Sequence, residues 1–179
     1  RLTTAGCYKA EHFIKFCDAF HIPVLTLTNV SGYAATVQEA GSIAIAAAKL
    51  TYAFANATVP KINVVTEKAY GSAYITMNSK HIGADLVYAL EGAKIGTMDS
   101  GLAVQIMYAD ELKGAGAAKL SEQKASEYDE LCQSAVSAAK RGYVDAVLAP
   151  ETLRQHLLYG FEMLFTKKEN LPDKKHGTV

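Results

Sequence analysis

The sequence predicts a single α/β domain, and three observations support that prediction. The chain has 179 residues, half of them hydrophobic, which is enough for one domain with a substantial core. Short apolar runs, such as 24–28 and 61–66, are typical of buried strands. These runs alternate with longer segments of helical periodicity, and that alternation is the pattern of an α/β fold.

The first half of the chain contains two expected helices and two expected strands. A helix is predicted over residues 8–20, where apolar side chains recur every three or four positions. Pro23 ends it, because the residue before a proline avoids the α-helical region. Strands are expected at 24–28 and 61–66. The segment 37–57 between them is dominated by alanine and predicts the longest helix.

The second half continues the alternation. We expect a turn and short helix (67–74), two strands (84–89 and 93–98), a helix from Asp99 to Tyr108, a polar helix (121–140), an extended piece (142–148) and a helix from Pro150 to about Thr166. Residues 113–119 are rich in glycine and alanine, and we expect them to be mobile. The charged stretch 167–179 is expected to be a surface tail, so the domain is expected to span 1–166.

The charge balance excludes several classes of partner. Lys plus Arg is 18 and Asp plus Glu is 18, which leaves a formal net charge of 0. Binding to nucleic acid or to an anionic membrane surface usually requires a basic excess, so we expect neither. The sequence has no run of about 18 apolar residues, so we expect no transmembrane helix.

The cysteines and the start of the chain bear on its context. Cys7, Cys17 and Cys132 are odd in number and widely spaced, which favours a reducing compartment and matches no zinc-site pattern. The chain begins at Arg1 without a signal peptide, which we interpret as an internal cut of a longer chain.

The turn Tyr70-Gly71-Ser72-Ala73-Tyr74 is the strongest candidate for chemistry. It connects a predicted strand to a predicted helix, and the N–H groups that begin a helix have no partner within it. Glycine and serine let a ligand approach the backbone closely. These features are those of an oxyanion hole, formed by the backbone of Gly71, Ser72 and Ala73. The alternative is an ordinary strand-to-helix turn.

Two further loops follow predicted strands. Gly32 and Tyr33 lie after the first strand, where ligand sites of open α/β sheets collect. Ser100 and Gly101 open a helix after a later strand, with Asp99 or Ser100 as the expected cap. A simple turn and a plain helix cap are the respective alternatives.

Side-chain catalysis has little support in the sequence. Ser72 and His81 could pair as nucleophile and base, but the Gly-x-Ser-x-Gly motif of a nucleophile elbow is absent. The phosphate, dinucleotide and zinc motifs GxxxxGK[ST], GxGxxG and HExxH are also absent, and we expect no metal. The residues therefore favour chemistry by backbone donors, in which the cofactor or the substrate supplies the base.

Several segments together resemble one family. They are Phe13–Phe20, Ile22–Leu27, Ala48–Lys61, Lys68–Tyr74, Met77–Asp85, Arg141–Asp145 and Lys174–Gly177. In this order they resemble the C-terminal half of the carboxyltransferase subunit of biotin-dependent acyl-CoA carboxylases. They are equally similar to the alpha subunit of sodium-pumping methylmalonyl-CoA and glutaconyl-CoA decarboxylases.

The resemblance implies a crotonase-like fold of repeated ββα units, one of two such domains in a full subunit. It implies carboxyl transfer between carboxybiotin and a short acyl-CoA of the propionyl-CoA/methylmalonyl-CoA type, with biotin itself as the base. This chain would be the biotin-side half, in which the N–H groups of Gly71, Ser72 and Ala73 stabilise the oxygen of the biotin enolate. The implied partners are a biotin carboxyl carrier, the N-terminal carboxyltransferase domain and further copies in a homo-oligomer. The implied location is cytoplasmic, and the alternative is a position peripheral to a membrane decarboxylase complex.

The chain departs from the family at several positions. Ser72 stands where the family usually has a second glycine, and Ser31-Gly32-Tyr33 stands where it commonly has Pro-Gly-Phe. The resemblance nevertheless implies cofactor-binding roles for Gly32, Tyr33, Tyr74, Ile75, Ser100 and Gly101. The apolar Ile75 would suit a short acyl chain.

Two alternatives remain open from the sequence. One is a ClpP-like serine hydrolase on the same superfold, with Ser72 as the nucleophile. The other is a non-catalytic assembly domain, whose helices at 37–57 and 100–108 form subunit interfaces.

Overall fold

The structure is a computed structural model, and it describes residues 1–114 and 116–171. The strands are β1 (Val24–Val30), β2 (Lys61–Tyr70), β3 (Leu86–Leu90), β4 (Lys94–Gly96) and β5 (Ala146–Leu148). The helices are α1 (Thr4–Ala19), α2 (Val37–Ala40), α3 (Ile43–Asn56), α4 (Gly71–Thr76), α5 (Ser100–Met107), α6 (Ala117–Tyr128), α7 (Ala135–Lys140) and α8 (Pro150–Met163).

The strands form one parallel sheet in the order β1-β2-β3-β5. β2 is longer than its neighbours. Its first half pairs with β3, from Ile62 opposite Leu86 onward, and its last residues, 68–70, pair with β4. The carboxyl end of β2 therefore extends past β3, and α4 begins directly from it.

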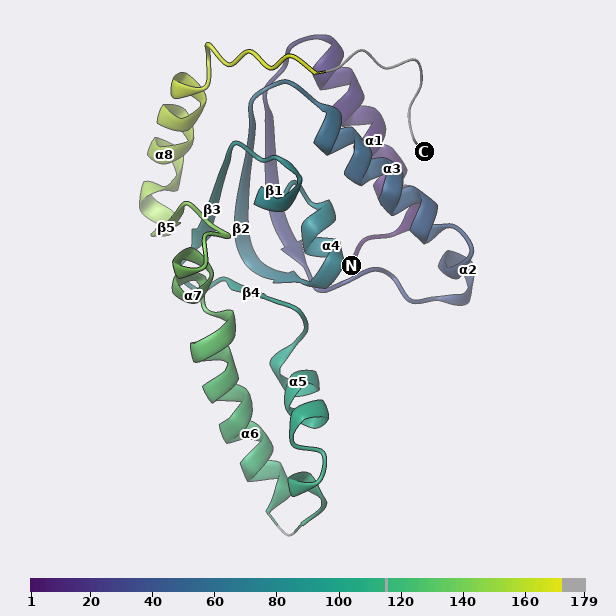
Figure 1. Cartoon of the computed structure of the whole chain (residues 1–179), viewed down its shortest axis with the longest axis vertical. Coiled ribbons are helices and arrows are strands. Elements are labelled where there is room, and N and C mark those ends of the chain that lie inside the picture. Colours follow the sequence, from purple (N-terminus) through teal and green to yellow (C-terminus); the bar gives the residue numbers. More distant parts are fainter. Residues whose placement is uncertain (115, 172–179) are drawn as a thin grey trace.

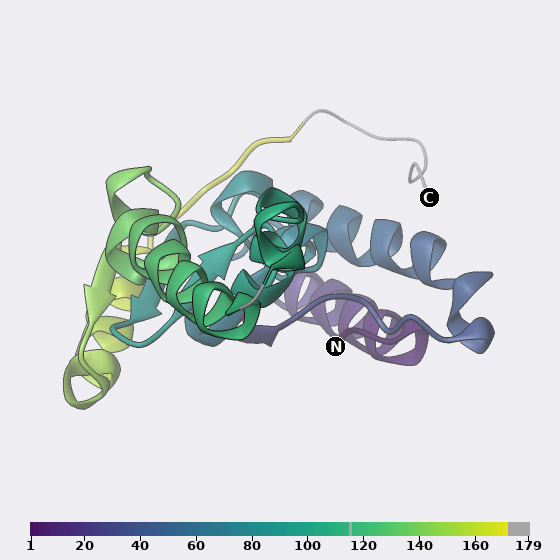
Figure 2. The same cartoon turned by 90° about the horizontal axis from the view of Figure 1, so that it is seen from below.

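Two helical layers cover the sheet (Figure 1). α1 and α3 pack on one face, over a core that includes Ile14, Leu50 and Phe54. α8 covers the opposite face, as Figure 2 also shows from below. Gly160 permits that contact, because a Cβ there would lie 3.0 Å from Ile62 Cδ1. The mixed α/β class and the parallel sheet confirm the predicted fold class.

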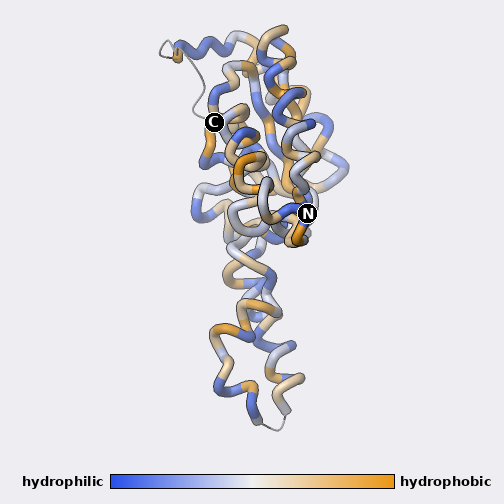
Figure 3. The backbone as a smooth tube through the Cα atoms, turned by 90° about the vertical axis from the view of Figure 1, so that its right-hand side faces the viewer, coloured by the Kyte–Doolittle hydropathy of each residue, from blue (hydrophilic) through white to orange (hydrophobic). Residues whose placement is uncertain are grey.

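An arm made of α5 and α6 projects from the sheet (Figures 1 and 3). The two helices lie side by side and contact each other. The side chains of Leu102, Ile106 and Met107 in α5 are each at least half exposed. The polypeptide returns to the sheet through a π-helical turn at Asp129–Gln133 and α7.

The structure corrects several predicted boundaries. β2 runs to Tyr70, so residues 67–70 are strand and not turn, because β4 offers them a pairing partner. The helix predicted at 37–57 is two helices separated at Gly41 and Ser42. Thr4 explains the break, because its N–H donates to Glu39 Oε2 at 2.6 Å and its Oγ1 lies 3.0 Å from Ser42 Oγ.

The helix predicted at 121–140 is likewise interrupted. Ser134 is extended, with φ −61° and ψ 148°, and forms an antiparallel bridge with Lys94. The stretch predicted as mobile, 113–119, is partly helical, since α6 begins at Ala117. Residue 115, and residues 172–179 of the predicted tail, lie outside the described residues.

Candidate functional site

The turn from β2 into α4 exposes unpartnered backbone donors. Gly71 has a φ of 61°, which side chains rarely adopt, and a Cβ there would lie 3.1 Å from the carbonyl oxygen of Thr97. Tyr70 occupies the cap position but makes no side-chain hydrogen bond to the first turn. The N–H groups that begin α4 are therefore open to an external acceptor.

A cavity of about 320 Å³ adjoins this turn. Its lining comes from four separate segments: Gly71, Ser72, Tyr74 and Ile75 of α4, then His81, then Ile95–Thr97, and finally Arg141 and Tyr143. The fold thus brings residues about 70 positions apart around one turn. The volume suits a small ring or the end of a larger ligand.

Three aromatic rings form one wall of the cavity. The centroids of Tyr74 and His81 lie 6.0 Å apart at 90°, and those of His81 and Tyr143 lie 5.2 Å apart. Tyr74 is 4% exposed, and among the described residues its hydroxyl has no hydrogen-bond partner. Burial raises the pKa of Tyr74 to about 12, with a smaller contribution from Tyr143, so the phenol stays protonated at neutral pH. A buried donor without a partner is suited to a ligand acceptor.

An ion pair holds this aromatic wall together. Lys80 Nζ lies 2.5 Å from Asp145 Oδ1, and Asp145 Oδ2 accepts a 2.8 Å hydrogen bond from the N–H of Val87. The short turn that carries His81 is thereby tied to the loop that carries Tyr143. The contact between the two rings lies beside this tie.

Another part of the lining depends on a close approach at Gly96. A Cβ at this position would lie 2.9 Å from Nε2 of Gln133, which is fully buried and donates to the carbonyl of Met98. Arg141 Nη1 donates to the carbonyl of Cys132 at 3.1 Å, which fixes the guanidinium at the rim. This part of the lining therefore combines the backbone of Ile95–Thr97 with the cationic side chain of Arg141.

The structure separates the predicted site residues into two groups. Gly71, Ser72, Tyr74 and Ile75 line the cavity, and Ala73 lies buried among them in the same helix. Gly32, Tyr33, Ser100 and Gly101 are not part of its lining. The hydroxyl of Tyr33 contacts Thr76 at 2.7 Å, behind α4.

The loop at Ser100 opens α5. Asp99 Oδ1 accepts from the N–H of Gly101 at 3.1 Å, so the helix has its own cap, and Ser100 is 8% exposed. The capping role expected for Asp99 is confirmed.

Sequence reasoning missed part of the lining. Arg141 and Tyr143 belong to a segment that carried the family resemblance, which could have indicated a role for them. His81 was considered only as a partner of Ser72, and the structure joins these two side chains by no hydrogen bond within its described residues. Ile95–Thr97 contribute mainly through their position beside β2, which no local motif indicates.

Other kinds of site have no support in the part of the chain that the structure describes. Among residues 1–114 and 116–171, no group of three or more His, Cys, Asp or Glu side chains is placed to hold a metal ion. No helix in these ranges has both the length and the apolar character needed to cross a bilayer. The three cysteines are free.

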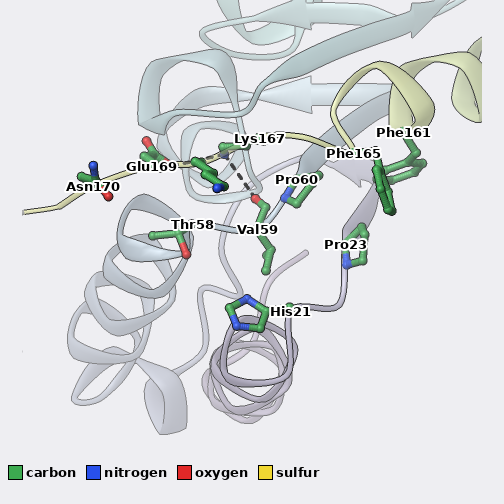
Figure 4. Close-up of a pocket in the computed structure, with 11 residues that line it drawn as sticks. His21, Pro23, Thr58, Val59, Pro60, Phe161, Phe165, Lys167, Glu169 and Asn170 are labelled. Carbon is green, nitrogen blue, oxygen red and sulfur yellow. Dashed lines mark hydrogen bonds and ion pairs between the residues drawn. The ribbon is translucent and has the colours of Figure 1, made fainter.

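A second cavity, of about 520 Å³, lies at the other end of the sheet, where Pro23 and Pro60 precede β1 and β2 (Figure 4). Lys167 borders it and contacts Asp85 at 2.9 Å, Glu169 at 3.2 Å and the carbonyl of Val59 at 3.3 Å. These contacts anchor the segment after α8 across the strand ends. None of the predicted site residues lies there.

Comparison with known proteins gives consistent matches. A family model for the carboxyl transferase domain matches residues 2–179. The methylmalonyl-CoA decarboxylase subunit alpha of Propionigenium modestum is 44% identical over 98% of this chain and 35% of that protein. The propionyl-CoA carboxylase beta chain of Saccharopolyspora erythraea is 44% identical over 96% of this chain and 32% of that protein.

Solved structures agree with the sequence matches. Transcarboxylase 12S, determined as a hexamer with methylmalonyl-coenzyme A bound, superposes with a TM-score of 0.93 at 38% identity. That match covers 99% of this chain and 34% of the other. The beta subunit of geranyl-CoA carboxylase from P. aeruginosa shares the fold at a TM-score of 0.77. The chain spans about a third of the length of the curated relatives it matches.

Proposed function

Because the chain belongs to the carboxyl transferase domain family, we propose that it is the biotin-side half of an enzyme that moves a carboxyl group between carboxybiotin and a short acyl-CoA. The named activities of its relatives, propionyl-CoA carboxylase and methylmalonyl-CoA decarboxylase, support this substrate class. The chain's own contribution is the turn at Gly71, Ser72 and Ala73 beside its cavity.

The single observation that carries the proposal is the uncapped start of α4. Backbone N–H groups held in a fixed turn stabilise negative charge that develops on a bound carbonyl oxygen, and they need no reorganisation as the charge forms. The N–H groups of Gly71, Ser72 and Ala73, which begin α4, would make this contact.

The cavity fits a biotin ring in two respects. Its unpartnered Tyr74 hydroxyl offers a buried donor, and its aromatic wall of Tyr74, His81 and Tyr143 offers a surface for a compact ring. When bound, biotin would supply the transferable carboxyl group and the base for the α-proton of the acyl-CoA. The chain would bind and orient that ring and stabilise charge, and within the described residues no hydrogen bond joins Ser72 to His81 as nucleophile and base.

Partners follow from the same proposal. We infer a biotin carrier, an N-terminal carboxyltransferase domain that completes the subunit, and assembly into a homo-oligomer. The match to a protein determined as a hexamer supports assembly. The exposed apolar side chains of α5, on the projecting arm, provide surface for it.

The test is carboxyl exchange by the full-length protein with its biotin carrier. A labelled carboxyl group should pass between methylmalonyl-CoA and carrier-bound biotin, and avidin should abolish the transfer. If no short acyl-CoA exchanges its carboxyl group with carrier-bound biotin, the proposal is refuted. Labelling of Ser72 by a fluorophosphonate would instead favour the hydrolase, for which the comparisons offer no support.

A further inference from the structure

A chain of hydroxyl groups runs behind α4 and ends on the backbone of the candidate oxyanion turn. Tyr33 Oη lies 2.7 Å from Thr76 Oγ1, and Thr76 Oγ1 donates to the carbonyl oxygen of Ser72 at 3.2 Å. Tyr33 Oη also lies 3.3 Å from that carbonyl. Thr76, at the centre of this chain, is 4% exposed, and Tyr33 is partly exposed.

The direction of donation follows from counting hydrogens. Tyr33 Oη has two acceptors within reach, Thr76 Oγ1 at 2.7 Å and the Ser72 carbonyl at 3.3 Å, and its one hydrogen is best directed to the nearer one. The hydrogen of Thr76 then goes to the Ser72 carbonyl, which can only accept. Each hydroxyl donates once, in a relay from Tyr33 through Thr76 to Ser72.

The acceptor of this relay belongs to the same peptide group as a proposed oxyanion donor. The carbonyl of Ser72 and the N–H of Ala73 share one planar, conjugated unit. A hydrogen bond to the carbonyl polarises that unit and strengthens its N–H as a donor, and linked hydrogen bonds reinforce one another. The relay also fixes the orientation of the peptide.

We propose that Tyr33 is a positioning residue, which acts through Thr76 to orient and polarise the Ser72–Ala73 peptide toward the bound oxygen. This inference rests on the proposed function. The unpartnered hydroxyl of Tyr74, 4% exposed in the wall of the cavity beside this turn, points independently to a ligand there. Tyr33 does not line that cavity, so its effect is indirect.

The relay can be read directly by NMR of the full-length protein. Labelling serine with ¹³C at the carbonyl and alanine with ¹⁵N selects Ser–Ala peptides, and those within this chain begin at Ser72, Ser134 and Ser137. In Tyr33→Phe and Thr76→Val, the carbonyl carbon of Ser72 and the nitrogen of Ala73 should both move upfield, while the other two peptides serve as internal references. Thr76→Ser keeps the hydroxyl and should restore both shifts.

Carboxyl exchange supplies the functional arm. Tyr33→Phe should lower kcat by about fivefold, the value of one neutral hydrogen bond, with KM for the acyl-CoA unchanged. Tyr159→Phe, on the exposed side of α8, should leave both constants unchanged. Unmoved Ser72 and Ala73 signals would overturn the inference, as would a higher KM at constant kcat, which marks direct ligand contact. If the wild-type protein exchanges nothing, the proposed function fails, and the NMR shifts alone then decide whether the relay exists.

Discussion

Gly71 and Thr97 approach each other so closely that the turn strongly favours glycine. A Cβ on residue 71 would lie 3.1 Å from the backbone carbonyl oxygen of Thr97, and Gly71 has a φ of 61°. β4 holds Thr97 in place, since Gly96 pairs with Tyr70 in the register of β2. The conformation of the turn is therefore imposed both by its own backbone and by its neighbour.

Gly71→Ala should consequently disable the site. The left-handed conformation costs alanine roughly 1 kcal/mol, and the contact with Thr97 adds to that cost. The backbone N–H groups of the turn would shift, and carboxyl exchange should fall by about 100-fold, as for the loss of one oxyanion donor. Gly92→Ala is the matched control, because a Cβ there meets nothing within 4 Å and the φ is ordinary. Equal activity of the two variants would show that the turn takes no part in exchange.

The pair Lys80 and Asp145 leads to a prediction about stability. Asp145→Ala removes the acceptor of the Val87 N–H, and Val87 is fully buried. We expect a loss of about 1–3 kcal/mol in the free energy of unfolding, because a buried donor would remain unsatisfied. Asp145→Asn retains an acceptor oxygen and should lose less. Urea denaturation of both variants measures the difference, and equal losses would assign the effect to the ion pair with Lys80.

Much of the fold could be predicted from the sequence because its signals are local. The apolar runs at 24–28 and 61–66 lie within β1 and β2, and helices α1 and α8 fall close to their predicted positions. The errors occur where tertiary contacts override local preference. β4 extends β2 to Tyr70, and the contact of Thr4 with Glu39 of α2 accompanies the break at Gly41 and Ser42.

The site could be predicted only in part, for a related reason. Gly71, Ser72 and Ala73 stand in one short motif, and the family resemblance indicates their role. Tyr143 lines the same cavity from a distant segment, which the ion pair of Asp145 with Lys80 joins to the turn of His81. No periodicity or spacing along the chain encodes that contact.

Gly96 and Gln133 offer a test of coupling across the cavity wall. Gly96→Ala would place a methyl carbon 2.9 Å from Nε2 of Gln133, which is closer than such contacts allow, and Gln133 is fully buried. We expect a destabilisation of about 1–3 kcal/mol from overpacking. In the background of Gln133→Ala the same change should cost much less, which a double-mutant cycle on thermal or urea unfolding would measure. Additive effects would mean that the side chain of Gln133 can move away freely.

Tyr74 should connect pH, stability and function. Burial raises the pKa of Tyr74 to about 12, above the value near 10 expected for an unfolded chain, so the folded state retains a proton that the unfolded state loses. The resulting stability is complete below about pH 10 and is lost as the pH rises toward 12, by an amount of about 3 kcal/mol. Tyr70 behaves similarly, with a pKa raised to about 12 chiefly by burial. Tyr74→Phe should therefore flatten part of this alkaline decline.

The same substitution separates folding from binding. At neutral pH, Tyr74→Phe removes a buried hydroxyl that has no partner among the described residues, so stability should hold or rise by about 1 kcal/mol. Carboxyl exchange should nevertheless weaken, because the ligand loses a donor. Denaturation at pH 7 and pH 11, measured beside exchange, tests both claims, with the exposed Tyr159→Phe as the control. A variant that is destabilised at pH 7 would show instead that the hydroxyl serves the fold.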